Sequence, residues 1–374
     1  MRIDAVEIHH LRLPLRDGFE ISSGRLTAIS TILVRLRSGE HEGWGEAPPW
    51  DEPIYGAETA ETAFHVLRDV IAPRVIGRSF ATPEELAALL ASWRGNNFAK
   101  AALETAWWVL RARMLGVPLH RLLGGDGTKP IDCGVSLGIE ATHDLLLDNV
   151  ARSLDEGYQR VKVKVKHGWD VDVLAKIRRK HPDIALQVDA NSHYTLADVD
   201  HLRRFDDFGL VQIEQPLAWD DLVDHAELQR RIRTPICLDE SIHSVDDARK
   251  AIALGSCRMI NIKLTRVGGL HEAKLIHDLC ARHDVPCWVG GMLESAIGEA
   301  ICMEFATLPN IRMPSDIFPS AHFYDDDTTS PLPTMSARGT FMPSTRPGIA
   351  YDPDWTAIAR LTVKSWSVVA ARAG

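Results

Sequence analysis

Five ionisable residues recur at an almost constant interval through the middle of this chain of 374 residues. They are Lys164, Asp189, Glu214, Asp239 and Lys263, separated by 25, 25, 25 and 24 positions. Each lies at or near the end of a short apolar run typical of a β-strand, and one strand, one helix and two loops take about 25 residues. In a β/α barrel, residues at the same phase of each repeat meet at the C-terminal face, where active sites are built. The interval therefore predicts a ring of charges at the mouth of a barrel.

Apolar segments that alternate with helix-forming stretches support this barrel from residue 131 onward. The predicted strands are 131–137, 160–165, 185–189, 210–214, 236–239, 259–263, 285–289 and a weaker one at 311–313. Strands buried on both faces read as continuous apolar runs. Eight such strands are the number needed to close a barrel.

Changes in the pattern of apolar and polar residues along the sequence divide the chain into three parts. Residues 1–125 begin with strand-like runs and continue with helical stretches at 87–93 and 99–115, as in an α+β domain. Residues 126–320 carry the β/α repeats. Residues 321–374 are first rich in Pro, Thr, Ser and Asp and regain periodicity at 355–369, which predicts a tail that packs back on the first domain.

Charge and cysteine content exclude several classes of protein. The net charge of -9 leaves no basic footprint for nucleic acid. No apolar run reaches the 18 residues of a membrane span, and the first residues do not resemble a signal peptide. The six cysteines form no CxxC pair, which is typical of reduced core residues. We therefore expect a cytoplasmic protein that binds neither nucleic acid nor membrane.

The three acids of the ring suggest a metal site. Carboxylates that converge in a poorly solvated site repel one another, so they take up protons or bind a cation. Ligand sets made only of oxygen favour a hard ion, and Mg²⁺, with Mn²⁺ as a substitute, suits an octahedron completed by water. Any one of Asp189, Glu214 and Asp239 taken alone could instead cap a helix or form a salt bridge.

The lysines of the ring suggest acid–base chemistry. Lys162, Lys164 and Lys166 alternate with valines, so they share one face of a strand and point toward the interior or the mouth. A lysine beside a dication and a second lysine has its pKa lowered from about 10.4 toward neutrality and can act as a general base. Lys263 lies four repeats from Lys164, on the opposite side of the mouth. Two amines that flank a cation suit removal of a proton beside a carboxylate.

Five short motifs carry a resemblance to a known family. They are KVK (162–164), DAN (189–191), EQP (214–216), DES (239–241) and NIK (261–263). With them the chain resembles the enolase superfamily, muconate cycloisomerase subgroup, whose general chemistry uses a Lys or His base with Mg²⁺. GVSLGI (134–139), KVKHGWD (164–170), RVGG (266–269) and GGMLESAIG (290–298) look most like the o-succinylbenzoate synthase and N-succinylamino acid racemase family.

The resemblance implies a fold and a set of roles. The fold class is α/β, a modified TIM barrel of the (β/α)7β type with an N-terminal α+β capping domain completed by the C-terminal tail. Asp189, Glu214 and Asp239 would bind Mg²⁺, and Lys164 and Lys263 would be the acid–base pair. The remaining roles fall to residues nearby: Lys162 beside the substrate carboxylate or tuning Lys164, Asn191 and Glu240 in support of the metal, and Arg266 at the position where racemising members carry arginine.

The expected substrate is a small carboxylate held under a lid. Phe19, Ile21, Trp50 and Tyr55 are expected on capping-domain loops that close over the mouth. Candidate substrate-binding residues are Phe19, Trp50, Tyr55, Gly291, Met292, Glu294 and Ile297; for Glu294 a structural salt bridge is an equal alternative. A homo-oligomer is expected.

Several reactions remain open at this point. The resemblance favours racemisation of N-acyl (succinyl) amino acids, dehydration of the o-succinylbenzoate synthase kind, or both. A muconate-type cycloisomerase, a dipeptide epimerase or another carboxylate dehydratase would use the same ring. A metal-independent aldolase that forms a Schiff base through Lys164 or Lys263 is an alternative of a different class, and a retired enzyme that serves as a binding or structural protein is another.

Overall fold

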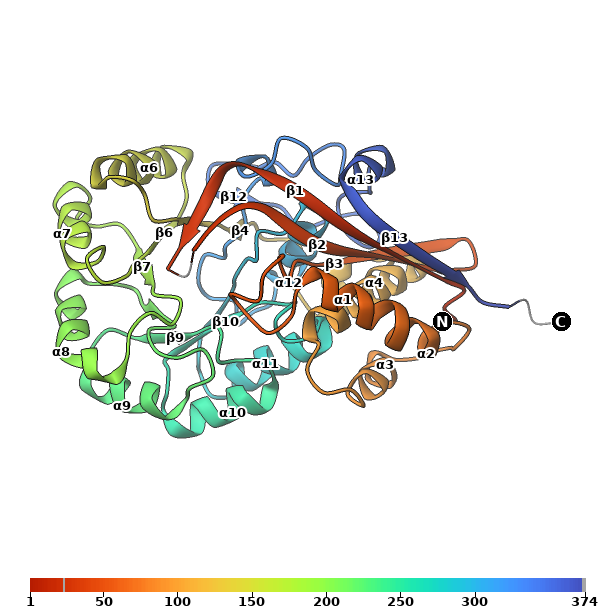
Figure 1. Ribbon diagram of the computed structural model, residues 1–374, viewed down its shortest axis with the longest axis horizontal. Coiled ribbons are helices and arrows are strands. Elements are labelled where there is room, and N and C mark those ends of the chain that lie inside the picture. The colour runs from red at the N-terminus through yellow and green to blue at the C-terminus, as the bar shows by residue number, and fades with distance from the viewer. Residues whose placement is uncertain (23, 372–374) are drawn as a thin grey trace.

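Two sheets of different kinds organise the chain (Figure 1). The computed structural model describes residues 1–22 and 24–371. A four-stranded antiparallel sheet has the strand order β13-β1-β2-β3, and a curled parallel sheet of seven strands has the order β11-β10-β9-β8-β7-β6-β5. A small two-stranded sheet pairs β12 with β4. None of the helices in the described residues is long and apolar enough to cross a membrane.

The antiparallel sheet forms the capping domain. Its strands are β1 (Ala5–Ile21), β2 (Gly24–Ser38), β3 (His41–Ala47) and β13 (Thr362–Val369). Helix α4 (Asn97–Leu115) packs directly on β3, because a Cβ atom at Gly43 or Gly45 would collide with its backbone. The segment GWGEAPP (43–49) therefore has a packing role: its glycines let the helix approach the sheet closely.

Short helices surround this sheet. They are α1 (Ala60–Val66), a π-helical turn (Leu67–Ile71), α2 (Ala72–Val75), α3 (Pro83–Leu90) and α5 (Leu119–Leu123). The Thr82 hydroxyl caps α3 by accepting from the Glu85 amide at 3.4 Å, as the Thr-Pro-Glu-Glu sequence at 82–85 predicts. The helix ends at Leu90, before the end of the helical stretch predicted at 87–93. Helix α4 ends at Gly116, which has the left-handed φ of 68° that favours glycine.

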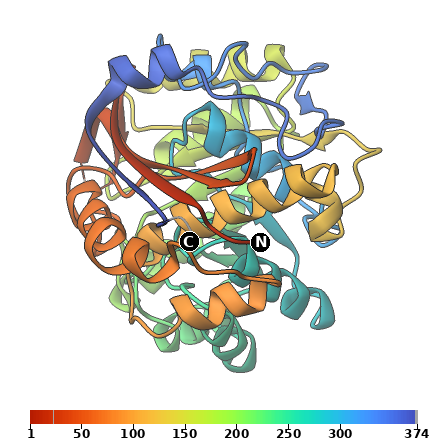
Figure 2. The same cartoon turned by 90° about the vertical axis from the view of Figure 1, so that its right-hand side faces the viewer.

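The tail returns to the first strand. The periodic segment predicted at 355–369 is a helix, α13 (Trp355–Leu361), followed directly by β13. Strand β13 pairs antiparallel with β1, from Ala5 opposite Val369 to Leu11 opposite Thr362, so both ends of the chain share one sheet (Figure 2). The capping domain completed by the tail is thereby confirmed as part of the fold, whereas the boundaries at residues 125 and 320 stay predictions.

The parallel sheet forms the barrel. Its strands are β5 (Gly134–Leu137), β6 (Arg160–Lys164), β7 (Leu186–Asp189), β8 (Ile213–Glu214), β9 (Ile236–Leu238), β10 (Met259–Ile262) and β11 (Cys287–Val289). The main helices that alternate with them are α6 (His143–Glu156), α7 (Val171–Lys180), α8 (Val199–Leu202), α9 (Val223–Arg231), α10 (Val245–Leu254), α11 (Leu270–Arg282) and α12 (Ala296–Phe305). Seven of the eight predicted strands are thus confirmed. The first of them is interrupted, because β4 (Ile131–Asp132) pairs with β12 (Thr340–Phe341) outside the barrel.

The eighth predicted strand is wrong as a strand. Its place is taken by an irregular segment that makes single bridges, from Ile311 to Cys287 of β11 and from Ser315 to Cys133 beside β5. The Gly134 amide donates to Ser315 O at 2.7 Å and the Asp316 amide donates to Val289 O at 2.8 Å. Pro314 lies in this segment and has no amide hydrogen to donate, so a regular ladder cannot form there. The segment nevertheless closes the barrel.

Buried carboxylates fasten the capping domain to the barrel. Glu104 of α4 accepts from the Leu270 amide at 2.7 Å and the His271 amide at 3.0 Å, at the N-terminus of barrel helix α11. Glu46 of β3 does the same for α12, through the Ser295 and Gly298 amides at 2.9 and 2.8 Å. A helix N-terminus offers free amides and a partial positive charge, so each carboxylate caps a helix of the other domain.

The interface predicts a pH dependence of stability. Burial raises the pKa of Glu104 to about 7, against about 4.3 for an exposed glutamate. The folded protein therefore binds a proton that the unfolded chain has released, and stability falls as the pH rises through this window, on the order of 3 kcal/mol in total. We expect the variant Glu104→Gln, which cannot titrate, to show a flatter dependence of unfolding free energy on pH between 4.5 and 7. Urea unfolding at several pH values measures this; equal slopes in the two proteins would contradict it.

Candidate active site

The strand register places the five ring residues at different heights along the barrel axis. Lys164 lies opposite Asp189, and Asp189 lies opposite Glu214, so the first three members occupy one layer. Glu214 then pairs with Cys237, which puts Asp239 two residues farther along its strand direction. Neighbouring strands of a barrel are shifted along one another by a fixed amount, the shear. Residues at a constant interval in sequence therefore lie progressively farther along the barrel axis. The last two members, Asp239 and Lys263, consequently lie just beyond β9 and β10, at the mouth.

On one side of the mouth, two lysines of β6 contact the acids. The Lys164 ammonium lies 2.6 Å from Asp189 Oδ2. The Lys162 ammonium lies 3.1 Å from Glu214 Oε2 and 3.8 Å from Asp189 Oδ2. Both lysines point inward, as their alternation with buried valines predicts, while Lys166 reaches the rim and pairs with Glu20 at 3.4 Å.

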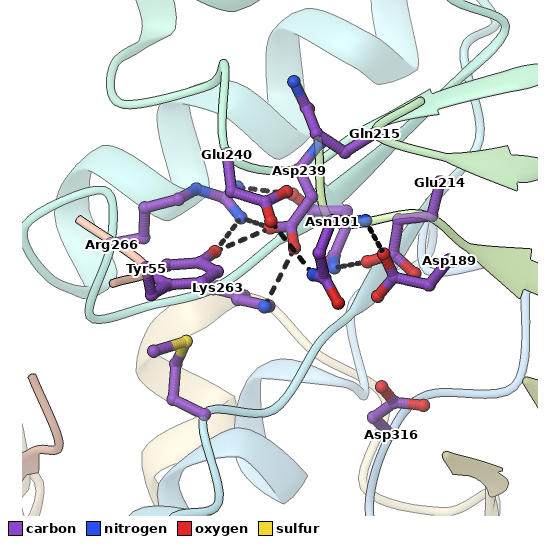
Figure 3. Close-up of polar contacts among 12 residues, drawn as sticks. Tyr55, Asp189, Asn191, Glu214, Gln215, Asp239, Glu240, Lys263, Arg266 and Asp316 are labelled. Atoms are coloured by element: carbon purple, nitrogen blue, oxygen red, sulfur yellow. Dashed lines mark hydrogen bonds and ion pairs between the residues drawn. The ribbon is translucent and has the colours of Figure 1, made fainter. Parts of the chain in front are cut away.

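On the opposite side, Lys263 and Arg266 converge on Asp239 (Figure 3). The Lys263 ammonium lies 2.9 Å from Asp239 Oδ2 and the Arg266 guanidinium contacts Oδ1. Tyr55 of the capping domain donates its hydroxyl to Asp239 Oδ1 at 2.9 Å, and its ring covers the Lys263 ammonium at 4.4 Å. The capping domain thus supplies one wall of the space enclosed by the ring lysines and acids, the reaction chamber.

The charges around Lys263 act against the lowering of its pKa that a dication would cause. Burial lowers the pKa of Lys263, but the Tyr55 hydroxyl and the carboxylates of Glu240, Glu214 and Asp189 together raise it. The lowering expected from the sequence assumed a bound dication; the protein groups alone produce the opposite shift. A base at this position therefore depends on positive charge brought into the site.

Asn191 and Glu240, beside the acids, each have an oxygen without a partner among residues 1–22 and 24–371. Asn191 donates to Glu240 Oε1 at 3.0 Å, which leaves Asn191 Oδ1 and Glu240 Oε2 buried and without a hydrogen bond. Burial and the nearby Asp189 carboxylate raise the pKa of Glu240 to about 7. Buried oxygens of this kind lack a positive partner, and with three carboxylates alongside they suit a hard divalent cation.

The predicted metal ligands are held in place by amides and cations. Glu214 accepts from Gln187 at 2.8 Å and from Asn261 at 2.7 Å, so both of its oxygens are oriented. Within residues 1–22 and 24–371, no three His, Cys, Asp or Glu side chains lie at the spacing of a metal site as they stand. In this structure the ring carboxylates pair instead with the lysines and Arg266.

Five of the predicted substrate-binding residues line a cavity of about 40 Å³ that also contains Lys162, Lys164 and Lys263. They are Phe19, Trp50, Tyr55, Gly291 and Met292. Trp50 donates its indole N–H to Met292 O at 3.1 Å, a bond between the capping domain and the barrel. The expectation that Phe19 and Ile21 lie on a loop is wrong, because both belong to β1 next to the β1–β2 turn.

The other two candidates lie outside this cavity lining. Glu294 accepts from the Met292 amide at 2.7 Å, and no ion pair is recorded for it in the described chain. It therefore makes a local turn contact in place of the salt bridge considered from the sequence. Ile297 is fully buried on α12.

Several residues of the chamber were not predicted from the sequence. Ser136 and Phe318 line the cavity, and Gln187 and Asn261 orient Glu214. Asp316 lines it too and pairs with Lys162 at 2.6 Å. Its position gave a usable signal, because it follows the eighth predicted strand as the acids of the ring follow the third to fifth.

Comparisons with known proteins agree with this geometry. Residues 3–124 match the family model of the mandelate racemase/muconate lactonizing enzyme N-terminal domain, and residues 146–357 match the enolase C-terminal domain-like model. The chain is 48% identical to an o-succinylbenzoate synthase of Geobacillus kaustophilus over 97% of this chain and 96% of that protein. It is 44% identical to an N-succinylamino acid racemase of Thermus thermophilus over 92% of both. A solved enolase superfamily member from Listeria innocua superposes with a TM-score of 0.94 at 34% identity, covering 99% of each chain.

The Tyr55 contact yields a prediction for divalent-cation binding. The variant Tyr55→Phe keeps the ring over Lys263 and removes only the hydroxyl that orients Asp239. Loss of such a supporting hydrogen bond costs about 10-fold in metal affinity. We expect the dissociation constant for Mn²⁺, measured by titration calorimetry, to rise by about that factor. Unchanged Mn²⁺ affinity in a correctly folded Tyr55→Phe protein would show that Asp239 does not need this support.

Proposed function

Because this chain belongs to the mandelate racemase/muconate lactonizing enzyme family of the enolase superfamily, we propose that it racemises N-acyl amino acids, N-succinyl derivatives foremost. The shared half-reaction is removal of the proton α to the substrate carboxylate. The family is one of enzymes, and its superfamily depends on divalent metal ions. Mg²⁺, with Mn²⁺ as a substitute, is the ion that we propose here.

The observation that carries the proposal is the pair of buried amines on opposite sides of one chamber. Lys164 ends β6 and Lys263 follows β10, with three strands between them in the closed sheet. Both line the cavity, and each ammonium contacts a different carboxylate. An α-carbon held between them presents one face to each amine. Racemisation needs one group to remove the proton and another to return a proton on the opposite face.

The acids and their supports would bind the other end of the substrate. Asp189, Glu214 and Asp239 would hold the dication, with Asn191 and Glu240 beside them. A dication bound there would draw in the substrate carboxylate and neutralise the charge that develops as the α-proton leaves. Lys162 stays charged on the floor of the chamber, because burial lowers its pKa but Asp316, Glu214 and Asp189 together raise it.

The amines then divide the proton transfers. A neutral Lys164 Nζ takes the α-proton of the enantiomer that faces it, and the Lys263 ammonium supplies a proton to the other face. The roles exchange for the other enantiomer. Tyr55 and Trp50 cover the chamber and exclude water from the charged intermediate.

Dehydration of the o-succinylbenzoate synthase kind is a second candidate. The 48% identity to a protein of that name over nearly the whole chain favours it. The first step is the same, and Lys164 would return its proton to the departing hydroxyl while Lys263 keeps its charge over the intermediate. Assays of one preparation with N-succinyl amino acids and with the hydroxy acid precursor separate the two activities.

The two-base arrangement predicts the behaviour of single lysine variants. Lys164→Ala and Lys263→Ala should each lose racemisation by about 100- to 10,000-fold, because one of the two proton transfers is gone. Each variant should still exchange the α-proton of one enantiomer, the one that faces its remaining lysine. Proton NMR in D₂O with each separate enantiomer of N-succinyl amino acids measures both effects.

A matched control lysine lies on the same strand face. Lys166 pairs with Glu20 at the rim, outside the lining of the chamber, so Lys166→Ala should racemise at nearly the wild-type rate. Full activity of both Lys164→Ala and Lys263→Ala would disprove the catalytic assignment. Absence of exchange by the wild-type protein across a broad panel of N-acyl amino acids would remove the racemase proposal.

Removal of metal separates this chemistry from a Schiff-base aldolase. We expect EDTA to abolish turnover and Mg²⁺ or Mn²⁺ to restore it, because the acids bind the substrate through a cation. An aldolase would keep its activity in EDTA, and borohydride would trap its substrate on Lys164 or Lys263. Mass spectrometry after borohydride treatment is the measurement, and an adduct on either lysine would favour the aldolase.

A further inference from the structure

A buried chain of charges lies beneath the reaction chamber. Arg160 donates to Asp316 Oδ1 at 2.7 Å, and the Lys162 ammonium lies 2.6 Å from Asp316 Oδ2. All three side chains are at least 96% buried. Lys162 then continues the chain to Glu214 at 3.1 Å, the middle one of the predicted metal ligands. Of the two carboxylates in this row of charges, Asp316 and Glu214, Asp316 is the one that lies outside the ring.

The surroundings fix Asp316 and Arg160 firmly. The Arg160 guanidinium also donates to Pro314 O at 2.9 Å and Val135 O at 3.3 Å. It lies 5.0 Å from the centre of the Trp288 ring, which the Lys162 ammonium approaches at 4.7 Å. A Cβ at Gly134 would collide with this guanidinium, so glycine makes the room for it. The positions of these groups follow from the strands. Arg160 and Lys162 are two residues apart on β6 and so share a strand face, and Gly134 of β5 is the register partner of Arg160.

Lys162 has three carboxylates within reach and lies nearest to Asp316. Its ammonium is 2.6 Å from Asp316, 3.1 Å from Glu214 and 3.8 Å from Asp189. An ammonium and a dication compete for the same carboxylate oxygens, because both are satisfied by negative charge at short range. Where Lys162 rests therefore decides how freely Glu214 and Asp189 can bind a cation.

We propose that Asp316, held by Arg160, is a positioning residue that draws the Lys162 ammonium toward the floor of the chamber and leaves Asp189 and Glu214 open to a divalent cation. The inference rests on the metal site of the proposed function. Without the Asp316 charge, Lys162 moves onto the two ring carboxylates and competes with the cation. The same anchor keeps Lys162 at a fixed place below the substrate carboxylate.

The test is a set of Mn²⁺ titrations by calorimetry. Asp316→Asn should weaken Mn²⁺ binding by about 10-fold. The double variant Asp316→Asn with Lys162→Met should bind Mn²⁺ at least as tightly as the wild type, since the competing ammonium is gone. Asp316→Glu, which keeps the charge, should restore most of the affinity. Circular dichroism and thermal unfolding show whether each variant is folded.

The outcomes distinguish this inference from the proposed function. Asp239→Asn removes a predicted metal ligand and should abolish Mn²⁺ binding; wild-type affinity in this variant would overturn the metal site itself. If Asp239→Asn loses binding while folded Asp316→Asn keeps wild-type affinity, only the role of Asp316 is overturned. Equal weakening in Asp316→Asn and in its double variant with Lys162→Met would show a general structural effect and would also overturn it.

Discussion

Compensation of buried charge is the constraint on which the rest of this structure depends. Ten ionisable side chains, each at least 94% buried, lie around and directly beneath the reaction chamber: the cations Arg160, Lys162, Lys164, Lys263 and Arg266, and the carboxylic acids Asp189, Glu214, Asp239, Glu240 and Asp316. The two sets balance in number, which is the condition under which such groups survive burial. The neutral form of Lys164 that accepts the α-proton carries one positive charge fewer, and a substrate carboxylate adds one negative charge, so the reacting cluster has an excess of two negative charges. A dication is the counter-charge that restores the balance, so metal binding and proton abstraction follow from one electrostatic requirement.

The barrel and the capping domain divide the work that this cluster requires. The barrel strands hold the amines and acids in register, because each side chain leaves a rigid, hydrogen-bonded strand end. The capping domain contributes Trp50 and Tyr55, which close the chamber through bonds to Met292 O and Asp239. Glu46 and Glu104 secure this domain to α12 and α11. The half-reaction is therefore set by the barrel, and the shape of the space left for substrate is set by the cap.

The sequence predicted the ring because a β/α unit has a nearly constant length, so Lys164, Asp189, Glu214, Asp239 and Lys263 could be found from spacing alone. The sequence did not predict that Asp239 and Lys263 lie beyond the ends of their strands, because their positions along the barrel axis come from the stagger between strands in the closed barrel. Asp316 was missed because it follows the weakest predicted strand, at 311–313, in a segment that forms only single bridges. The contacts of Trp50 depend on how the cap sits on the barrel, a tertiary relation that no local pattern encodes.

The chamber between the cap and the barrel is small in this structure. A cavity of about 40 Å³ holds roughly three water molecules, at 10–15 Å³ for each, which is far less than an N-acyl amino acid needs. Larger spaces of about 240 and 680 Å³ adjoin it; the first shares Ile21, Tyr55 and Asn191 with its lining, and the second shares Phe19 and Ser136. Phe19, Ile21 and Tyr55 belong to the capping domain, and the first two lie next to the turn of the β1–β2 hairpin. Movement of the hairpin and of the segment around Tyr55 would join the three spaces without disturbing the strands that carry the charges. Phe19 and Ile21, on the side where substrate would enter, contact neither the ring lysines nor the ring acids through a hydrogen bond or ion pair, which fits one barrel chemistry serving different carboxylates.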